Sequence, residues 1–138
     1  MAILGIGYDL VTVTEFAEQM NRPGTAMLSS FRPGERRYAE SKSPDPARHY
    51  AVRWAAKEAV IKAWASSRFA RPPSVGDNAY AQIEVVNDAW GRPSIKLHDE
   101  AAEFLPGAII HLSLTHDGDM AGAMVVIEEP DLVVPVAD

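Results

Sequence analysis

The chain has 138 residues, of which 47% are hydrophobic, and its formal net charge at pH 7 is −6. A chain of this length buries roughly two-thirds of the surface that its unfolded form exposes, so one domain can fold without disulfides or structural metals. The absence of cysteine excludes a disulfide scaffold, a thiolate zinc site and a cysteine nucleophile. We find no secretory signal and no run of ~20 apolar residues, and therefore expect a cytoplasmic protein without a membrane partner.

Charge is distributed unevenly along the chain. Residues 22–71 carry 11 basic and 4 acidic side chains, whereas residues 72–138 carry 2 basic and 12 acidic ones. A phosphate-rich partner is therefore expected at the basic segment. A long nucleic acid is not expected, because the acidic C-terminal half would repel its backbone.

The N-terminal residues predict a short strand at 3–8, with side chains alternating between two faces. Gly5 and Gly7 leave one face without side chains, and Asp9 follows on that same face. Glycine inside a strand often marks the close approach of a ligand or of another backbone.

Three helices are expected in the first half of the chain. A weak one begins at Thr12 and ends at the break formed by residues 22–24, and a short one begins near Pro33. The longest spans residues 46–69 and ends before two prolines. Its alanines recur every four residues and give a smooth stripe on which a sheet can pack closely: Ala51, Ala55, Ala59 and Ala63.

The second half of the chain predicts mostly strands. After a loop at 70–80 we expect strands at 81–86, 94–97, 108–115 and 120–128, a hairpin turn at 88–93 and a brief helix at 99–104. Residues 1–129 are expected to form the single domain, and residues 130–138 a flexible tail.

Four charged side chains lie within three turns of the long helix: Arg53, Lys57, Glu58 and Lys62. One interpretation is an exposed face with ordinary ion pairs between residues four apart. The other is a carboxylate that binds a divalent cation among cations that bind phosphates. Asp9 is the candidate second carboxylate, although an acid at a strand end also commonly caps a helix.

A second candidate site lies on the strand predicted at 108–115. Its polar face carries His111, Ser113 and Thr115, which suit phosphate oxygens, and His116 follows at the strand end. The alternative is that both histidines bond only to backbone groups. His111 and His116 do not predict a pair of metal ligands, because side chains five residues apart on a strand point to opposite faces. No P-loop, dinucleotide fingerprint or nucleophile elbow is present.

Four motifs, taken in order and spacing, resemble the holo-[acyl-carrier-protein] synthases, the small trimeric type of 4′-phosphopantetheinyl transferase. They occupy residues 5–10, residues 53–59 with Lys62 and Ala63, residues 88–93, and residues 111–116. The resemblance implies a 4′-phosphopantetheinyl transferase fold of the α+β class, with the long helix packed on an antiparallel sheet. It also implies a homotrimer whose active sites lie at subunit interfaces.

The reaction implied by the resemblance moves 4′-phosphopantetheine from coenzyme A to a serine of an acyl carrier protein, or of the carrier domain of a fatty acid synthase. Adenosine 3′,5′-bisphosphate leaves, and Mg²⁺ is the cofactor. The resemblance makes Asp9 and Glu58 the metal ligands. Lys62 takes the serine proton or stabilises the pyrophosphate, with a metal-bound water as the alternative base.

The remaining roles are also carried over from the resemblance. The catalytic group is Asp9, Glu58, Lys62 and His116. Coenzyme A is contacted by Arg53, Lys57, Lys62, Gly91, Arg92, Pro93, Ser113, Thr115 and His116. The alternative function is a non-catalytic module that binds coenzyme A or a nucleotide, although such a module would be expected to have lost one of the three acidic and basic groups Asp9, Glu58 and Lys62.

The chain departs from many relatives in its first helix. That helix is basic in many relatives and docks the acidic carrier protein, whereas residues 11–20 contain Glu15 and Glu18 and no lysine or arginine. Electrostatic docking through this helix is therefore not expected. One alternative is that the carrier is a domain of a large fatty acid synthase whose own surface differs. The other is that basic residues of the next segment dock the carrier: Arg22, Arg32, Arg36, Arg37 and Lys42.

Overall fold

The computed structural model describes residues 2–42, 44–72 and 78–130. The elements in chain order are β1 (Ile3–Thr12), α1 (Val13–Met20), a 3₁₀ turn η1 (Met27–Ser30), α2 (Pro33–Glu40), α3 (Pro46–Ser66), α4 (Ala79–Gln82), β2 (Ile83–Asn87), β3 (Pro93–Leu97), α5 (Asp99–Phe104), β4 (Ile109–Asp117) and β5 (Met120–Glu128). The predicted α+β class is confirmed. No helix among these residues is both long and apolar enough to cross a membrane.

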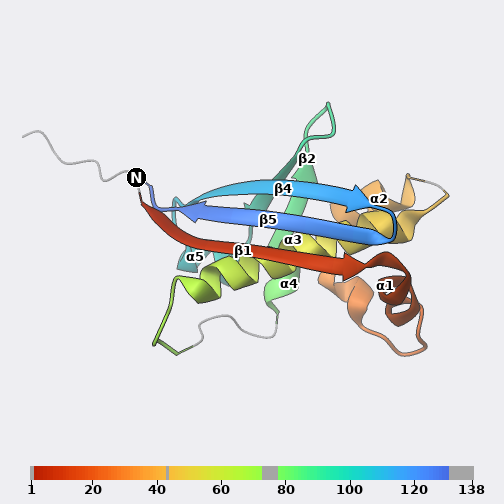
Figure 1. Ribbon diagram of the computed structural model, residues 1–138, viewed down its shortest axis with the longest axis horizontal. Helices are drawn as coiled ribbons and strands as arrows, with labels where there is room; N and C mark the ends of the chain where they lie inside the picture. The colour runs from red at the N-terminus through yellow and green to blue at the C-terminus, as the bar shows by residue number, and fades with distance from the viewer. Residues whose placement is uncertain (1, 43, 73–77, 131–138) are drawn as a thin grey trace, which may run out of the picture.

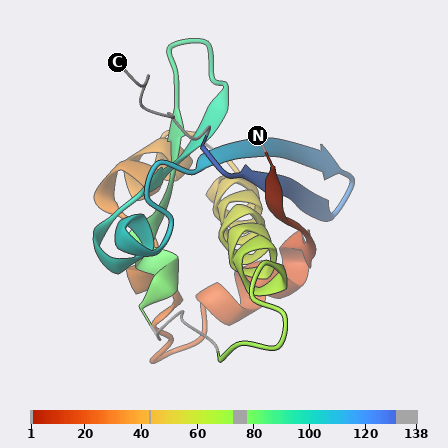
Figure 2. The same cartoon turned by 90° about the vertical axis from the view of Figure 1, so that its left-hand side faces the viewer.

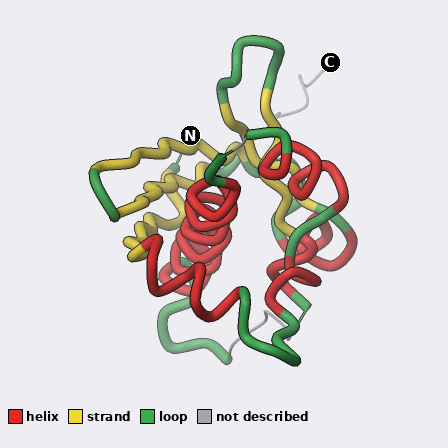
Figure 3. Tube along the Cα trace, turned by 90° about the vertical axis from the view of Figure 1, so that its right-hand side faces the viewer, coloured by secondary structure: helices red, strands yellow, loops and turns green. Residues whose placement is uncertain are grey.

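Strands β1, β5 and β4 form an antiparallel three-stranded sheet with β5 in the centre. Helix α3 runs beneath this sheet, as Figure 1 shows. Strands β2 and β3 pair separately as an antiparallel hairpin, whose turn projects from the body of the molecule. In Figure 2 and Figure 3, α3 lies between the sheet and a second layer that contains the hairpin with α2, α4 and α5. The long helix thus packs on an antiparallel sheet, as expected.

Four elements differ from the sequence-based expectation. Strand β4 continues to Asp117 instead of ending at residue 115, because it pairs with β5 as far as Met120. Strand β1 continues to Thr12 instead of ending at residue 8, because it pairs with β5 as far as Met120. Helix α3 ends at Ser66, where the hydroxyls of Ser66 and Ser67 donate to carbonyls three residues back and compete with the helical hydrogen bonds. A short helix, α4, replaces the start of the strand predicted at 81.

Two expectations fall on residues that lie outside the described ranges. These are the central part of the loop predicted at 70–80 and the tail predicted at 130–138, of which only Pro130 is described.

The backbones of α3 and β1 are in direct contact. A Cβ atom on Gly5 would lie 1.9 Å from the carbonyl oxygen of Ala63, and one on Gly7 would lie 2.1 Å from the carbonyl oxygen of Ala59. Only glycine permits such an approach. Of the two explanations for the predicted glycine-lined face, a neighbouring backbone is therefore the correct one.

The core has two parts along α3. The first joins the alanine face of the helix, which includes Ala55, Ala59 and Ala63 at 0% exposure, to Val125 and Ile127 of β5. The second packs aromatic rings at the N-terminal half of the helix, where Phe31 lies 5.0 Å from Tyr50 between ring centroids. These contacts hold α1, η1 and α2 around α3, and so fix the surroundings of the candidate site.

We predict that Gly7→Ala lowers the free energy of unfolding by about 3 kcal/mol, because its methyl group overlaps backbone that has no space to move. Gly118→Ala is the control: its φ of +57° costs about 1 kcal/mol for an L-residue, but no atom lies within 4 Å of the added methyl. Urea unfolding at one protein concentration measures both. Equal losses would contradict the steric explanation.

Candidate functional site

Asp9 and Lys62 meet where β1 crosses α3. The Nζ of Lys62 lies 2.8 Å from Oδ1 of Asp9 and donates more weakly to the carbonyl of Tyr8, at 3.3 Å. The contact follows from the fold, because the glycines two and four residues before Asp9 seat the strand on the helix. The lysine is half-exposed, whereas its partner is mostly covered. An anion approaching from solvent would therefore meet the ammonium first.

Glu58 lies one turn before Lys62 and lines the same cavity as Asp9. That cavity has a volume of about 360 Å³ and is bounded by β1, α1 and α3. The hydroxyl of Tyr80 donates to Oε1 of Glu58 at 2.8 Å. Burial, followed by this hydrogen bond, raises the pKa of Tyr80 to about 12, so the phenol remains a donor at neutral pH. The fold therefore brings the two predicted carboxylates, from distant segments, to the same cavity.

The pKa of Lys62 is raised, chiefly by its hydrogen bond to Asp9. A general base needs the opposite shift, because it must be unprotonated to accept a proton. In this geometry Lys62 is a positively charged donor. Of the two roles considered for it from the sequence, charge stabilisation fits the observed contact.

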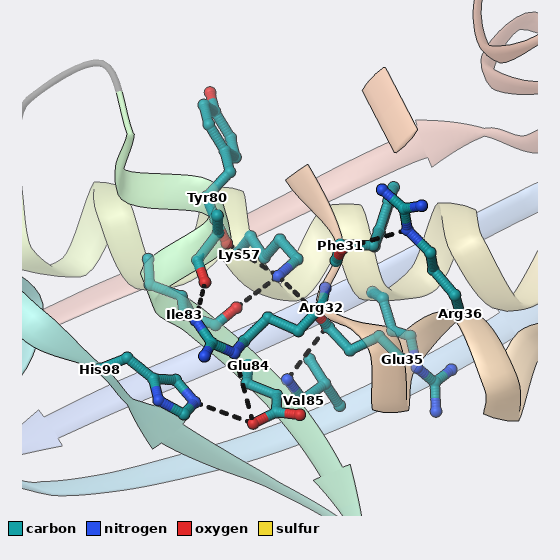
Figure 4. A network of polar contacts seen from close by, with 12 residues as sticks. Phe31, Arg32, Glu35, Arg36, Lys57, Tyr80, Ile83, Glu84, Val85 and His98 are labelled. Atoms are coloured by element: carbon teal, nitrogen blue, oxygen red, sulfur yellow. Dashed lines mark hydrogen bonds and ion pairs between the residues drawn. The ribbon is translucent and has the colours of Figure 1, made fainter. Parts of the chain in front are cut away.

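Lys57 does not reach any ligand-accessible surface, which corrects the expectation that it holds phosphate. Its side chain is fully buried, and Nζ donates to Oε1 of Glu35 at 2.8 Å, to the carbonyl of Tyr80 at 2.8 Å and to the carbonyl of Ile83. All three ammonium donors are therefore satisfied within the chain. Figure 4 shows this network. The geometry gives Lys57 a structural role.

Glu35 is the acceptor that makes the burial of Lys57 possible. Besides the lysine, it accepts from the backbone N–H of Arg32 at 2.9 Å and from that of Val85 at 3.1 Å. A carboxylate with three donors needs no water. The network joins α2, α3 and β2. The sequence showed Glu35 only as an acidic residue in the first turn of a helix, so its partnership with Lys57 could not be recognised.

Arg53 borders a second cavity, of about 380 Å³. Its guanidinium donates to the carbonyl of His49 at 3.2 Å and to Oδ1 of Asn87 at 2.6 Å, and lies over the ring of Tyr38 at 4.2 Å. The residue is 2% exposed, and its Nε has no hydrogen-bond partner among the described residues. Residues that line this cavity are Tyr38, His49, Val52, Arg53, Asn87, Gly91, Pro93, Leu112, Ser113, Leu114 and His116.

The second cavity gathers several residues that the sequence placed far apart. His116 lies 6.1 Å from His49 between ring centroids. Burial and the nearby arginines lower the pKa of His116, because a second positive charge is unfavourable there. Tyr38, His49 and Asn87 were not identified from the sequence, since no motif marks them.

The other predicted residues are divided between different surfaces. Arg92 does not line the second cavity and pairs with Asp88 at 2.6 Å in the hairpin turn. Ser113 and Thr115 point to the outer face of the sheet, where they share a cavity of about 200 Å³ with Asp9. His111 also faces outward, 3.4 Å from Glu128. One chain therefore holds the carboxylates and the Arg53 cavity as separate groups.

We predict that Lys57→Met lowers the free energy of unfolding by about 3–5 kcal/mol, because it leaves the carboxylate of Glu35 buried without its cation. The double variant Glu35→Gln, Lys57→Met should recover part of the loss. Chemical unfolding followed by circular dichroism measures both. If Lys57→Met is as stable as the wild type but binds coenzyme A more weakly, Lys57 is a ligand and not a structural residue.

Comparison with known proteins gives a consistent result. Residues 5–119 match the 4′-phosphopantetheinyl transferase superfamily. A holo-[acyl-carrier-protein] synthase from Nocardia farcinica is 73% identical over 131 residues, which are 94% of this chain and 90% of that protein. The solved acyl carrier protein synthase of Mycobacterium tuberculosis shares 50% identity with a TM-score of 0.78, covering 94% of this chain and 100% of that one.

A second solved structure is described as the acyl carrier protein synthase–coenzyme A complex of Chronobacterium ammoniagenes. It has a TM-score of 0.85 and 39% identity, and covers 95% of this chain and 100% of the other. These matches span both the sequence and the fold, and they confirm the resemblance inferred from the four motifs. The chain belongs to the 4′-phosphopantetheinyl transferase superfamily and groups within it with the holo-[acyl-carrier-protein] synthases.

Proposed function

We propose that this protein transfers 4′-phosphopantetheine from coenzyme A to a serine of an acyl carrier protein, or of a carrier domain in a fatty acid synthase. The observation that carries the proposal is the pairing of Asp9 and Glu58 around one cavity, with Lys62 hydrogen-bonded to Asp9. Family membership supports the reaction, and the coenzyme A complex of a relative at 39% identity supports the donor. Cytoplasm remains the expected compartment.

In the reaction, the serine oxygen of the carrier forms a bond to the phosphorus that bears pantetheine. The bond from this phosphorus to the bridging oxygen breaks, and adenosine 3′,5′-bisphosphate leaves. Negative charge increases on the departing phosphate, and the half-exposed ammonium of Lys62 is positioned to stabilise it. The serine proton passes to a water molecule, because Nζ of Lys62 already donates to Asp9 and to the carbonyl of Tyr8.

The two carboxylates suit Mg²⁺. This ion is commonly bound by one or two carboxylates together with phosphate oxygens of a substrate. Asp9 and Glu58 come from β1 and α3, and no cluster of three or more potential ligands occurs among the described residues. The donor set therefore fits an ion that completes its coordination with the pyrophosphate. When bound, Mg²⁺ would neutralise charge on the pyrophosphate and on the leaving group.

The Arg53 cavity is the candidate binding region for the nucleotide half of coenzyme A. Its buried guanidinium has an unpartnered Nε, and His116, Gly91 and Pro93 lie around it. Charge-assisted hydrogen bonds to a phosphate are worth about 1.5–3 kcal/mol each. Ser113 borders this cavity as well as the outer face.

A trimer would unite the two groups of site residues. The outer face of the sheet is covered by exposed apolar side chains, among them Tyr8 at 69%, Leu10 at 63% and Met124 at 51%. Contiguous apolar surface of this kind commonly forms an interface. Three copies meeting through it would complete the carboxylate site of one chain with residues of another, as the resemblance implies.

Docking of the carrier has fewer candidate cations than the sequence suggested. Arg36 donates to the carbonyls of Phe31 and Leu28, so it secures η1. Arg32 donates to the carbonyl of Ala81. Arg22, Arg37 and Lys42 are exposed and remain the candidate contacts in this segment.

We expect Asp9→Asn and Glu58→Gln each to reduce Mg²⁺-dependent transfer by at least about 100-fold, because each removes a charge from the metal site. The assay incubates apo carrier protein with the enzyme, coenzyme A and Mg²⁺, and measures the carrier by mass spectrometry. Circular dichroism checks that both variants fold. Binding of coenzyme A by the wild type without any mass gain on the carrier would favour the non-catalytic module.

We further predict that Ile6→Glu and Met124→Glu each convert the protein to a monomer and abolish transfer. Both side chains are exposed on the outer face of a single chain, so a charge there disrupts only contacts between copies. Lys96→Glu, on the exposed side of β3, is the control for introducing the same residue elsewhere. Sedimentation velocity gives the oligomeric state; a variant that sediments as the wild type does would remove this face from the interface.

A further inference from the structure

Tyr80 is held at both ends. Its backbone carbonyl accepts from Nζ of the buried Lys57 at 2.8 Å, and its ring stacks on Trp54 with centroids 4.6 Å apart and planes 5° from parallel. Figure 4 shows the ring extending away from the buried ion pair, while the backbone remains beside Lys57. The hydroxyl at the far end donates to Glu58 at 2.8 Å. A rigid group therefore connects the core to this carboxylate.

The carboxylate of Glu58 needs such support more than that of Asp9 does. A glutamate side chain has one more rotatable bond than an aspartate, so ordering it costs more conformational entropy. Asp9 is already bonded to Lys62 on its own side of the cavity. Each carboxylate thus has a different donor, and for Glu58 that donor is tied to the Lys57–Glu35 pair through the backbone of the same residue.

A hydrogen bond to one carboxylate oxygen leaves the group with further acceptor capacity, because each carboxylate offers about four lone-pair sites. Partners of this kind orient metal-binding side chains without touching the ion, and removing one typically weakens metal binding by 10–100-fold. Trp54 and Tyr80 were not linked to the site by the sequence, since Tyr80 lies 22 residues from Glu58.

We propose that Tyr80 is a positioning residue, which orients the carboxylate of Glu58 toward the cavity that it shares with Asp9. The inference rests on the proposed function, because it takes that cavity as the Mg²⁺ site. Tyr80 does not contact substrate or the reacting atoms in this assignment. It acts through Glu58 alone, and the Lys57–Glu35 pair fixes the position of its backbone.

Tyr80→Phe tests the proposal, since it removes the hydroxyl and keeps the ring that stacks on Trp54. Tyr50→Phe is a matched control: the hydroxyl of Tyr50, on α3, donates to Glu40 of α2 at 2.9 Å, a similar tyrosine–glutamate pair between two helices that lies outside the cavity. The probe is Mn²⁺, titrated into enzyme saturated with coenzyme A and detected by electron paramagnetic resonance. Transfer to apo carrier is measured in parallel over a range of Mg²⁺ concentrations.

For Tyr80→Phe we expect about tenfold weaker Mn²⁺ binding and an equal rise in the Mg²⁺ concentration that gives half-maximal transfer. The value of kcat at saturating Mg²⁺ and the KM for coenzyme A should remain close to wild type, and Tyr50→Phe should alter neither metal dependence. If the wild type transfers and Tyr80→Phe has the same Mn²⁺ and Mg²⁺ dependence as the wild type, the role of Tyr80 is overturned and the proposed function stands. A wild type that neither binds Mn²⁺ nor transfers would overturn the proposed function and this inference with it.

Discussion

The candidate site depends on the direct backbone contact between β1 and α3. No side chain separates the two elements at Gly5 and Gly7, where the carbonyls of Ala63 and Ala59 occupy the space of the missing Cβ atoms. A larger residue in the strand would lift it from the helix by several tenths of an ångström or more. Asp9, two residues after Gly7, would then lose the geometry of its 2.8 Å contact with Lys62. The close packing of β1 on α3 is therefore required for the contact between Asp9 and Lys62.

On the opposite side of α3, the Lys57–Glu35 pair fixes the positions of the neighbouring elements. Burial lowers the pKa of Lys57 and Glu35 opposes that shift, and the three acceptors around Nζ match the three donors of an ammonium group. Removing both charges from water is costly, so the pair adds little net stability. In the observed placement of α2, α4 and β2, the ammonium of Lys57 and both carboxylate oxygens of Glu35 have partners, so the pair ties these elements to α3.

Much of the fold was accessible from the sequence, because periodicity and glycine or proline breaks mark elements that depend on local pattern. The alternation in β4, with Leu112 and Leu114 inward and Ser113 outward, was predicted correctly. The difference between Lys57 and Lys62 was not, since both lie on one helix in similar surroundings. Their roles are decided by Glu35 and Asp9, which reach α3 from other elements. Tertiary partners of this kind leave no mark on local spacing.

The charge of a segment likewise does not show which of its cations are available to a ligand. The excess of cations in residues 22–71 predicted a strong field for a phosphate-rich partner. In the fold, Lys57 neutralises Glu35, and Arg32 and Arg36 bond to backbone carbonyls. Donors engaged in this way are less available to a ligand, although their charges still contribute at a distance. Arg53 lies buried beside a cavity, and its Nε has no hydrogen-bond partner among the described residues, so it is the cation of this segment that we propose for phosphate recognition.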